Sequence, residues 1–299
     1  MLDAWGDHPA VRQTLDEASA ALGQDLASLI HNGPKEDLAL TTNTQPVMLV
    51  AGVAAYRAWR AEGGQAPAVV AGHSLGEYAA LVAAEVLTLA DAVPLVRLRA
   101  QAMQEAVPVG QGAMAAILGL TSAQVIEGCT QAQASFGADS TEVVDAAKFN
   151  DPAQTVIAGS KAAVDKACEL LKGMGAKRAL LLPVSAPFHS RLMKPAAQRL
   201  QARLAEMNLH APSIPVLNNI DVSVETDPAR IRDALYRQAF GPVRWVECVQ
   251  AIKARGIGAV IECGPGKVLA GLTRRIDAEL LGGAVFDPAS LQETRTLLT

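Results

Sequence analysis

The sequence predicts an α/β fold, and three features of its 299 residues indicate this class. Half of the residues are apolar but only 4% are aromatic, which favours helices around buried strands over a β-sandwich. Short apolar runs alternate with longer amphipathic segments, as in a parallel sheet covered by helices. One apolar run, at residues 67–71, leads directly into Gly-His-Ser-Leu-Gly at 72–76, and an apolar helical segment follows. This succession predicts a strand, a sharp turn and a helix.

Charge and cysteine spacing exclude several classes of protein. The formal net charge of −4 does not provide the basic surface of a nucleic-acid-binding or membrane-surface protein. The four cysteines are scattered without metal-ligand spacing, so we expect reduced core thiols and no metal site. No uninterrupted apolar run reaches the ~18–20 residues of a membrane span, and Asp3 and Asp7 stand where a signal peptide would be basic and then apolar. These features predict a cytoplasmic protein that contacts neither nucleic acid nor membrane.

The first two elements expected are helices. Residues 7–22 form the first, because Asp7 can cap it, Pro9 suits its first turn and Gly23 suits its exit. Its apolar stripe consists of Val11, Leu15, Ala18 and Leu22. The second helix, at 46–61, is apolar nearly all round and should therefore be buried.

Residues 67–86 form the segment around which the rest of the chain is organised. The strand at 67–71, the turn and a helix ending near Val86 match the nucleophile elbow. That geometry lifts the Ser74 hydroxyl off the end of a sheet and points a helix N-terminus at whatever reacts there. We expect that a side chain at either Gly72 or Gly76 would crowd the strand against the helix. The alternative is an ordinary glycine-containing turn between a strand and a helix.

An arginine interrupts the apolar face of the next helix, which Thr88 opens in a capping pattern with Asp91. Leu95, Arg99 and Met103 share one face of that helix. A guanidinium cannot shed its charge, so a buried one needs an anionic partner. A salt bridge to a core carboxylate and a ligand-binding role fit this observation equally well.

Residues 109–184 are predicted to form a small domain that interrupts a larger one. The segment 107–111 breaks the preceding pattern, and the elements after it follow in the order βαββαβ, the ferredoxin-like arrangement. The strands expected are 113–118, 142–149, 155–158 and 178–182, and the helices are 122–130 and 162–171. The large domain, with a parallel sheet of α/β-hydrolase-like type, would then comprise 1–108 and 185–299.

The chain returns to the large domain through a proline-framed loop at 183–190. Helices are expected at 192–207, 228–239 and 245–253. A short strand is expected at 214–217, a buried strand at 258–263, and a last amphipathic helix after Gly264-Pro265-Gly266.

A serine hydroxyl needs a base, and the chain offers five histidines. His73 adjoins Ser74 in the turn and should point away from it. His189 lies in the proline-framed loop at the junction of the two domains, where active sites tend to form. We therefore predict that His189 serves Ser74, the alternative being a histidine with a purely structural role.

Five motifs occur in order along the chain. They are Gly-His-Ser-Leu-Gly-Glu-Tyr at 72–78, Met-Gln-Glu-Ala-Val-Pro at 103–108, Pro-Phe-His-Ser at 187–190, Asn-Asn at 218–219 and Glu-Cys-Gly-Pro-Gly-Lys-Val-Leu at 262–269. With them the sequence resembles the bacterial malonyl-CoA:acyl carrier protein transacylases. The likeness runs over essentially the whole chain, insert included.

The resemblance implies a role for each candidate site residue. Ser74 would be the acylated nucleophile, His189 its base, and Arg99 the partner of the malonyl carboxylate, which its planar fork matches. The backbone carbonyl of Gln238 would orient the base, and the Leu75 N–H would be one oxyanion donor. Met103 and Phe188 would line the acyl pocket.

The implied reaction is ping-pong transfer of a malonyl group from malonyl-CoA, through malonyl-Ser74, to the phosphopantetheine thiol of acyl carrier protein. It would supply extender units for fatty acid biosynthesis, with no cofactor, and we expect the protein to be a monomer. Two alternatives stay open: a serine esterase or thioesterase of α/β-hydrolase type, and a truncated inactive homologue that only binds the carrier protein.

One feature departs from the family pattern. Family members begin with a strand that ends in a Gln-Gly-Ser-Gln-type loop, which supplies a second oxyanion donor. The present sequence starts with Met-Leu-Asp-Ala-Trp, after that loop. We therefore expect the native protein to extend upstream of Met1.

Overall fold

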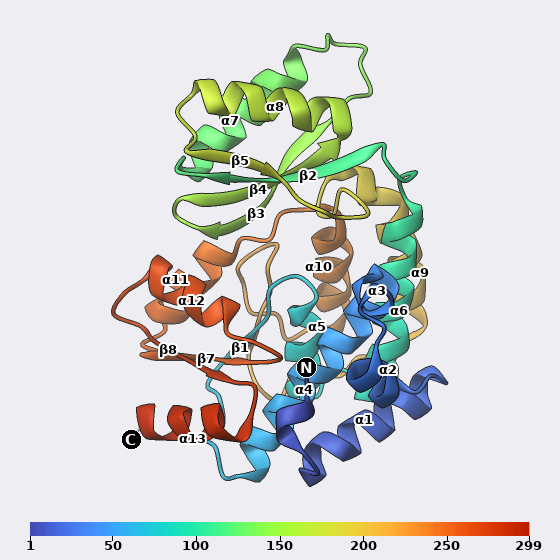
Figure 1. Ribbon diagram of the computed structural model, residues 1–299, viewed down its shortest axis with the longest axis vertical. Coiled ribbons are helices and arrows are strands. Elements are labelled where there is room, and N and C mark those ends of the chain that lie inside the picture. Colours follow the sequence, from blue (N-terminus) through green and yellow to red (C-terminus); the bar gives the residue numbers. More distant parts are fainter. Residues whose placement is uncertain (299) are drawn as a thin grey trace.

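The structure, a computed structural model, describes residues 1–298 (Figure 1). Its strands form one four-stranded antiparallel sheet and two two-stranded parallel sheets, surrounded by helices. The predicted α/β class is therefore confirmed. Over the residues described, none of the helices has the length and apolar character needed to cross a membrane.

The N-terminal region is helical. A short 3-10 turn, η1 (Asp3–Trp5), precedes α1 (Pro9–Leu22), which has the predicted bounds to within two residues. Two short helices that we did not predict follow, α2 (Leu26–Asn32) and α3 (Lys35–Ala39). They have only seven and five residues, too few to show a clear helical period.

Helix α4 (Thr41–Ala61) begins five residues before the predicted start at Pro46. A proline inside a helix removes one backbone hydrogen bond. The extra turn is nevertheless held, because the Thr44 hydroxyl donates to the carbonyl of Leu38 at 2.6 Å and Gln45 is buried with Pro46. Most of α4 is buried, as its composition predicted, and it contacts both α5 and β7.

The strand before the elbow is shorter than predicted. Only β1 (Val70–Ala71) pairs, in parallel, with β6 (Val216–Leu217). Helix α5 (Gly76–Ala83) also ends before Val86, because Glu85 takes a positive φ of 63°. Helix α6 (Leu89–Glu105) begins as predicted: the Thr88 side chain accepts a bond from the Asp91 N–H at 3.0 Å.

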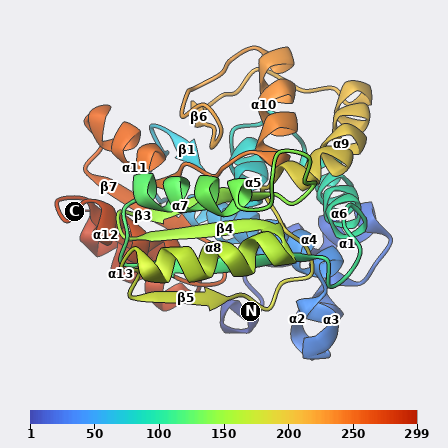
Figure 2. The same cartoon turned by 90° about the horizontal axis from the view of Figure 1, so that it is seen from above.

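Residues 112–181 form what we call the antiparallel layer, at the top of Figure 1. Its elements are β2 (Gly112–Leu118), α7 (Ser122–Ala134), β3 (Val144–Asp151), β4 (Gln154–Ser160), α8 (Lys161–Gly173) and β5 (Arg178–Leu181). The strand order is β3-β4-β2-β5, and α7 and α8 lie together on the outer face (Figure 2). The opposite face carries a second apolar cluster, against which Phe188 packs.

The C-terminal region differs more from the prediction. The turn η2 (Arg191–Met193) and helices α9 (Lys194–Glu206), α10 (Pro228–Phe240) and α11 (Trp245–Ala254) match the predicted segments. Strand β7 (Ala259–Cys263) is half-buried rather than buried, and α12 (Val268–Ile276) is not the last element. Strand β8 (Leu281–Val285), which pairs in parallel with β7, and helix α13 (Pro288–Leu297) follow it.

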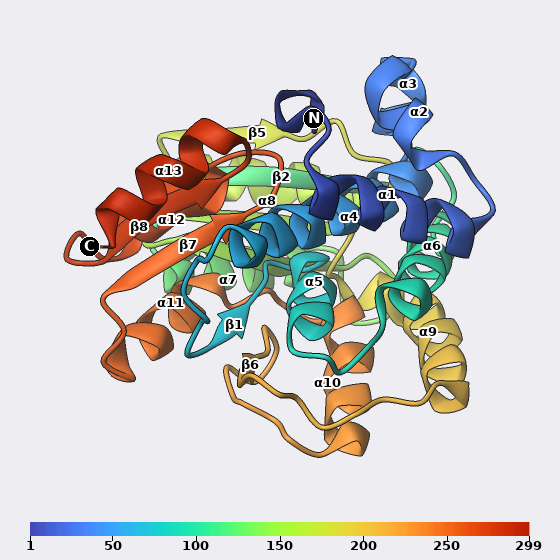
Figure 3. The same cartoon turned by 90° about the horizontal axis from the view of Figure 1, so that it is seen from below.

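The predicted single parallel sheet is divided. Among residues 1–298, β1 pairs only with β6 and β7 pairs only with β8 (Figure 3). Helix α4 packs closely here, since a methyl group on Gly52 would lie 3.4 Å from the Cys263 carbonyl oxygen and 3.6 Å from the Ala79 side chain. The four cysteines are all free, as expected of core thiols, and three of them are buried.

Candidate active site

The elbow places Ser74 on a sharp turn between β1 and α5. Ser74 has a φ of +54°, a conformation that non-glycine residues rarely adopt and that occurs at functional sites. A side chain on Gly72 would lie 1.9 Å from the backbone carbon of Gly76, so only glycine fits at 72. The same reasoning was wrong for Gly76, where a methyl group would meet nothing within 4 Å. The crowding involves the backbone of Gly76, not its missing side chain.

Asn219, which follows β6, braces this turn from the neighbouring strand. Its side-chain oxygen accepts from the Ser74 N–H at 2.7 Å, and its side-chain nitrogen donates to the Gly72 carbonyl at 2.8 Å. Its own N–H donates to the Glu77 carboxylate at 2.9 Å. The sequence analysis quoted Asn218-Asn219 only as part of a motif. A buried polar pair directly after a strand was the available signal for this structural role.

His189 faces the serine in the manner that base catalysis requires. Its Nε2 lies 2.6 Å from Ser74 Oγ, and its Nδ1 lies 2.9 Å from the Gln238 carbonyl and 3.2 Å from the Gly241 carbonyl. Since a carbonyl oxygen only accepts, Nδ1 carries the proton and Nε2 is left to accept the serine proton. His189 is 2% exposed and, like Ser74, has a positive φ, of 63°.

Burial keeps this imidazole neutral. It lowers the pKa of His189 well below 6.5, and the positive charges of Lys148 and Arg99 lower it further. His73 points away from Ser74, as predicted, with its Nε2 2.9 Å from the side-chain oxygen of Asn150. Burial also lowers the pKa of His73, to about 4.

Arg99 is a buried cation beside the nucleophile. It is 3% exposed, shares its buried face with Leu95 and Met103, and donates from Nη2 to Ser74 Oγ at 3.1 Å. Its other bonds go to the side-chain oxygens of Gln45, at 2.6 Å, and Gln238, at 3.2 Å. In the described part of the chain, no carboxylate lies within ion-pair distance of Arg99, so the salt-bridge alternative is not observed. Neutral oxygens accept from its two terminal nitrogens, but among residues 1–298 its Nε is buried without a hydrogen-bond partner. The negative charge of Glu77 favours the charged form of Arg99 only from beyond ion-pair distance.

Glu77 is linked through the Gln238 side chain to the backbone of Ser74. Its carboxylate accepts from the Gln238 side chain at 3.0 Å, and that same nitrogen donates to the Ser74 carbonyl, also at 3.0 Å. Burial raises the pKa of Glu77 to about 7, although its hydrogen bonds oppose that shift. We did not predict roles for Glu77 or Gln45. An acidic residue in the first turn of a helix is ordinarily explained by the helix dipole.

The remaining predicted residues lie around this cluster. Leu75 directly precedes α5, so its N–H is at the helix N-terminus beside Ser74. Met103 is 1% exposed within the main core, and Phe188 packs between that core and the antiparallel layer. The structure thus brings Ser74, His189, Arg99 and Gln238 into direct contact. The pocket-lining role of Met103 and Phe188 stays a prediction.

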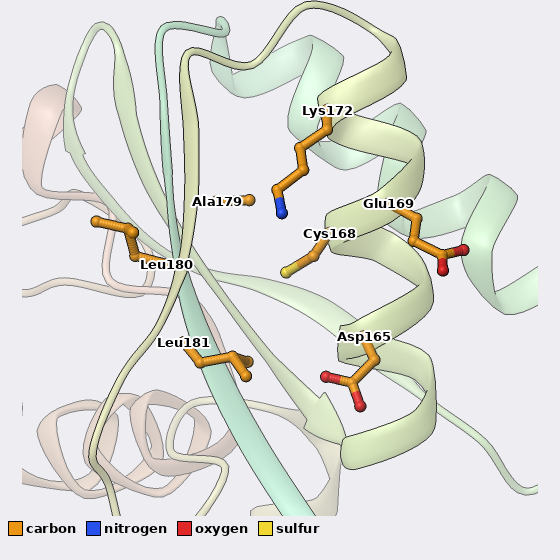
Figure 4. Close-up of a pocket in the computed structure, with 7 residues that line it drawn as sticks. All are labelled: Asp165, Cys168, Glu169, Lys172, Ala179, Leu180 and Leu181. Carbon is orange, nitrogen blue, oxygen red and sulfur yellow. The ribbon is translucent and has the colours of Figure 1, made fainter.

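A recess of about 350 Å³ lies elsewhere, between α8 and β5 on the antiparallel layer (Figure 4). Cys168 and Lys172 from α8 line it together with Leu180 and Leu181 from β5. Burial raises the pKa of Cys168, so its thiol stays protonated and unreactive at neutral pH. None of the lining residues bonds to the Ser74 cluster, and we assign no chemistry to this recess.

Comparison with known proteins gives consistent matches over nearly the whole chain. Residues 6–278 match the acyl transferase domain family. The malonyl CoA-acyl carrier protein transacylase of Escherichia coli K12 is 50% identical over 97% of this chain and 92% of its own length. A crystal structure of an acyl-carrier-protein S-malonyltransferase from Burkholderia pseudomallei covers all of this chain and 94% of that one, with a TM-score of 0.95 and 62% identity.

A further similar structure was determined with a carrier protein bound. It holds a malonyl-transacylase in complex with a type II polyketide acyl-carrier protein. The match has a TM-score of 0.91 and 48% identity, and covers 95% of this chain and 90% of that one.

Proposed function

This chain belongs to the acyl transferase domain family, and we propose that it transfers the malonyl group of malonyl-CoA to the phosphopantetheine thiol of acyl carrier protein through a malonyl-Ser74 intermediate. The observation that carries this proposal is the position of Ser74 Oγ, 2.6 Å from a neutral imidazole nitrogen and 3.1 Å from a buried guanidinium. The first group activates a nucleophile, and the second attracts an acyl group that bears a carboxylate.

In the acylation step, His189 Nε2 takes the proton of Ser74 while Oγ attacks the thioester carbonyl of malonyl-CoA. The Gln238 carbonyl, which accepts from Nδ1, holds the imidazole in the required tautomer and stabilises the imidazolium that forms. Negative charge on the carbonyl oxygen is stabilised by the Leu75 N–H at the start of α5. Collapse of the tetrahedral intermediate breaks the carbon–sulfur bond, and His189 returns the proton to the CoA sulfur.

The second half-reaction runs the same steps in reverse. The thiol of the carrier protein gives its proton to His189 and attacks the malonyl-Ser74 ester, and Ser74 leaves with the proton. Arg99 would hold the malonyl carboxylate in both halves, with Met103 and Phe188 beside the acyl group. A charge-paired acyl group in a site that excludes water would favour the thiol over hydrolysis.

We also propose the finer description of the fold. The strand order β3-β4-β2-β5 supports a ferredoxin-like domain at 109–184, inserted into an α/β-hydrolase-like catalytic domain comprising 1–108 and 185–299. The active site would then lie where the two meet, because His189 follows the insert and Ser74 precedes it. We further propose a cytoplasmic monomer that uses no cofactor and supplies fatty acid synthesis.

A transfer assay tests the proposal against its alternatives. Purified protein is mixed with radiolabelled malonyl-CoA and phosphopantetheinylated carrier protein, and label on the carrier is compared with free malonate. We expect the label to move to the carrier. Release of malonate with rapid cleavage of p-nitrophenyl esters would indicate an esterase or thioesterase instead. Neither product, with carrier binding retained, would indicate an inactive binding protein.

Replacement of Arg99 by alanine tests the carboxylate clamp. Loss of a buried, charge-assisted hydrogen-bond pair is worth several kcal/mol, so we expect malonyl transfer to fall by a factor of about 10² or more. Transfer of an acetyl group, which lacks the carboxylate, should fall far less. The measurement is kcat/KM for both CoA thioesters, and an equal loss for both would contradict the clamp.

The pH profile tests the environment of His189. A base works when unprotonated, so kcat/KM falls as pH decreases through the pKa of the free enzyme. Burial, Lys148, Arg99 and His73 all lower the pKa of His189, so the acid limb should lie below pH 6.5. Glu77 bonds to the Gln238 side chain and to the Asn219 N–H, and does not contact the imidazole. A limb centred at or above pH 6.5 in the CoA-release step would contradict this picture.

A further inference from the structure

Strand β3 of the antiparallel layer is tied to the segment that orients the catalytic histidine. The Val243 N–H donates to the Ala147 carbonyl at 2.9 Å, and the Phe149 N–H donates to the Val243 carbonyl at 2.9 Å. Val243 lies two residues after Gly241, whose carbonyl is 3.2 Å from His189 Nδ1. Lys148, between these two anchored residues, is therefore held beside the active site by backbone geometry.

A second contact from the same strand reaches the elbow. Asn150, two residues after Lys148, lies with its side-chain oxygen 2.9 Å from Nε2 of His73, the neighbour of Ser74. Strand β3 thus approaches the site both from the side of the base and from the side of the nucleophile. Because β3 is fixed at both of these contacts, the backbone of Lys148 stays close to the active site.

The ammonium of Lys148 lies within electrostatic reach of the catalytic cluster. Its charge lowers the pKa of both His189 and His73. Burial lowers the pKa of Lys148 itself to about 8, and Arg99 contributes to the shift. Over residues 1–298, the Lys148 side chain has no hydrogen-bond or ion-pair partner. The buried Arg99 and the half-buried Lys148 therefore both act on the site, and neither is paired with a carboxylate.

The acidic groups that are nearest in the sequence are engaged elsewhere. Asp151 pairs with Arg275 of α12 at 2.8 Å, and Asp145 pairs with Arg191. On α11, another of the helices that contact β3, Glu247 pairs with Arg244. A partly desolvated charge without a counter-ion is unfavourable in the free protein, so an anionic ligand would be attracted to this position.

We propose that Lys148 is a second acyl-recognition residue, which pairs with the malonyl carboxylate together with Arg99 and so makes the antiparallel layer part of the specificity site. This inference rests on the proposed malonyl transfer. The two cations would approach the carboxylate from different elements, Arg99 from α6 and Lys148 from β3. An acetyl group carries no negative charge, so it can pair with neither Arg99 nor Lys148.

The carboxylate fits Lys148 better than the phosphate of CoA or of the carrier arm. In both thioesters the phosphates are separated from the sulfur by the whole pantetheine arm, and the sulfur must reach Ser74. Lys148, by contrast, is coupled electrostatically to Arg99 and His189, which both touch the Ser74 hydroxyl. The malonyl carboxylate is part of the acyl group, so it is the anion that is brought close to Lys148 when the thioester reaches Ser74.

The test is the malonyl-to-acetyl preference of K148M, taken from kcat/KM for CoA release with each thioester. We expect the preference to fall about 10- to 100-fold, the range that a charged hydrogen bond supplies. K148R, which keeps the charge, should retain most of it. K172M, which removes an exposed lysine of the same layer, is the matched control and should leave it unchanged. An unchanged preference in K148M, or equal loss for both thioesters, would overturn the inference.

Folding of the variant does not decide the outcome. Methionine matches the unbranched stem of lysine and removes a half-buried charge that has no partner, so we expect K148M to melt at the same temperature or higher. If it did not fold, the wild-type protein would provide the readout. Lys148 loses its charge as pH rises through about 8, while Arg99 stays charged and His189 and Glu77 have already lost their protons. The malonyl-to-acetyl preference should then fall above pH 8, and a constant preference would overturn the inference.

The proposed function and this inference fail in different ways. If wild-type protein does not move malonyl to the carrier, the function is wrong. If it does, and Lys148 variants keep full preference for malonyl, only the inference is wrong.

Discussion

Replacing Ser74 by alanine should abolish malonyl transfer, with a fall in kcat by a factor of about 10⁴ to 10⁶. The reason is that the variant has no oxygen to form the acyl intermediate. In the wild-type protein, His189 Nε2 and Arg99 Nη2 lie 2.6 Å and 3.1 Å from Ser74 Oγ. In the variant both groups lose this hydrogen-bond partner. The measurement is the rate of malonyl–carrier formation under saturating substrate, with residual rates compared with the uncatalysed exchange.

The matched control is Ser28→Ala, which removes a hydroxyl from an exposed serine on α2. It should leave the rate unchanged. Circular dichroism and thermal melting should show that both variants fold. Transfer by the Ser74 variant at more than about a hundredth of the wild-type rate would mean that another group carries the acyl intermediate.

Replacing His189 by alanine should cause a loss of similar size, about 10⁴-fold or more in kcat. Without the imidazole, no group in contact with Ser74 Oγ can accept its proton, since Arg99 only donates. Because nucleophile and base act as a unit, the Ser74 and His189 double variant should lose no more than either single variant.

His210→Ala is the control, because His210 is exposed in the loop before β6. We expect it to be fully active. A His189 variant that keeps more than a tenth of the wild-type rate would contradict the assignment of the base, and a double variant much slower than both single variants would contradict the joint action of the pair.

Local signals predicted most of the helices and the nucleophile. Thr88 caps α6 as its spacing with Asp91 indicated, and the buried face of Arg99 followed from its position between Leu95 and Met103. These features depend on neighbours within a few residues, which a sequence displays directly. The strand before the elbow was overestimated for the same reason: an apolar run indicates a strand but does not reveal how much of it finds a pairing partner.

Features that depend on distant partners could not be predicted in this way. Asn219 reaches Ser74 from 145 positions away, and Gln45 reaches Arg99 from 54 positions away. Strand β8 was missed because Gly282 and Gly283 lower its β-propensity, whereas its stability comes from pairing with β7. The position of Lys148 could not be predicted either, since a lysine in a strand is ordinarily exposed. The contacts of β3 with Val243 and α11 leave it half-buried beside the site.

The most direct test of the central claim is mass spectrometry of the wild-type protein after brief exposure to malonyl-CoA without carrier protein. Acid quenching and peptide mapping would locate any adduct. We predict one malonyl group per chain, on the peptide that contains Ser74, which disappears when carrier protein is added and appears there as malonyl-carrier. An adduct on a different residue, or transfer to the carrier with no adduct on Ser74 at any time, would contradict a ping-pong mechanism through this serine.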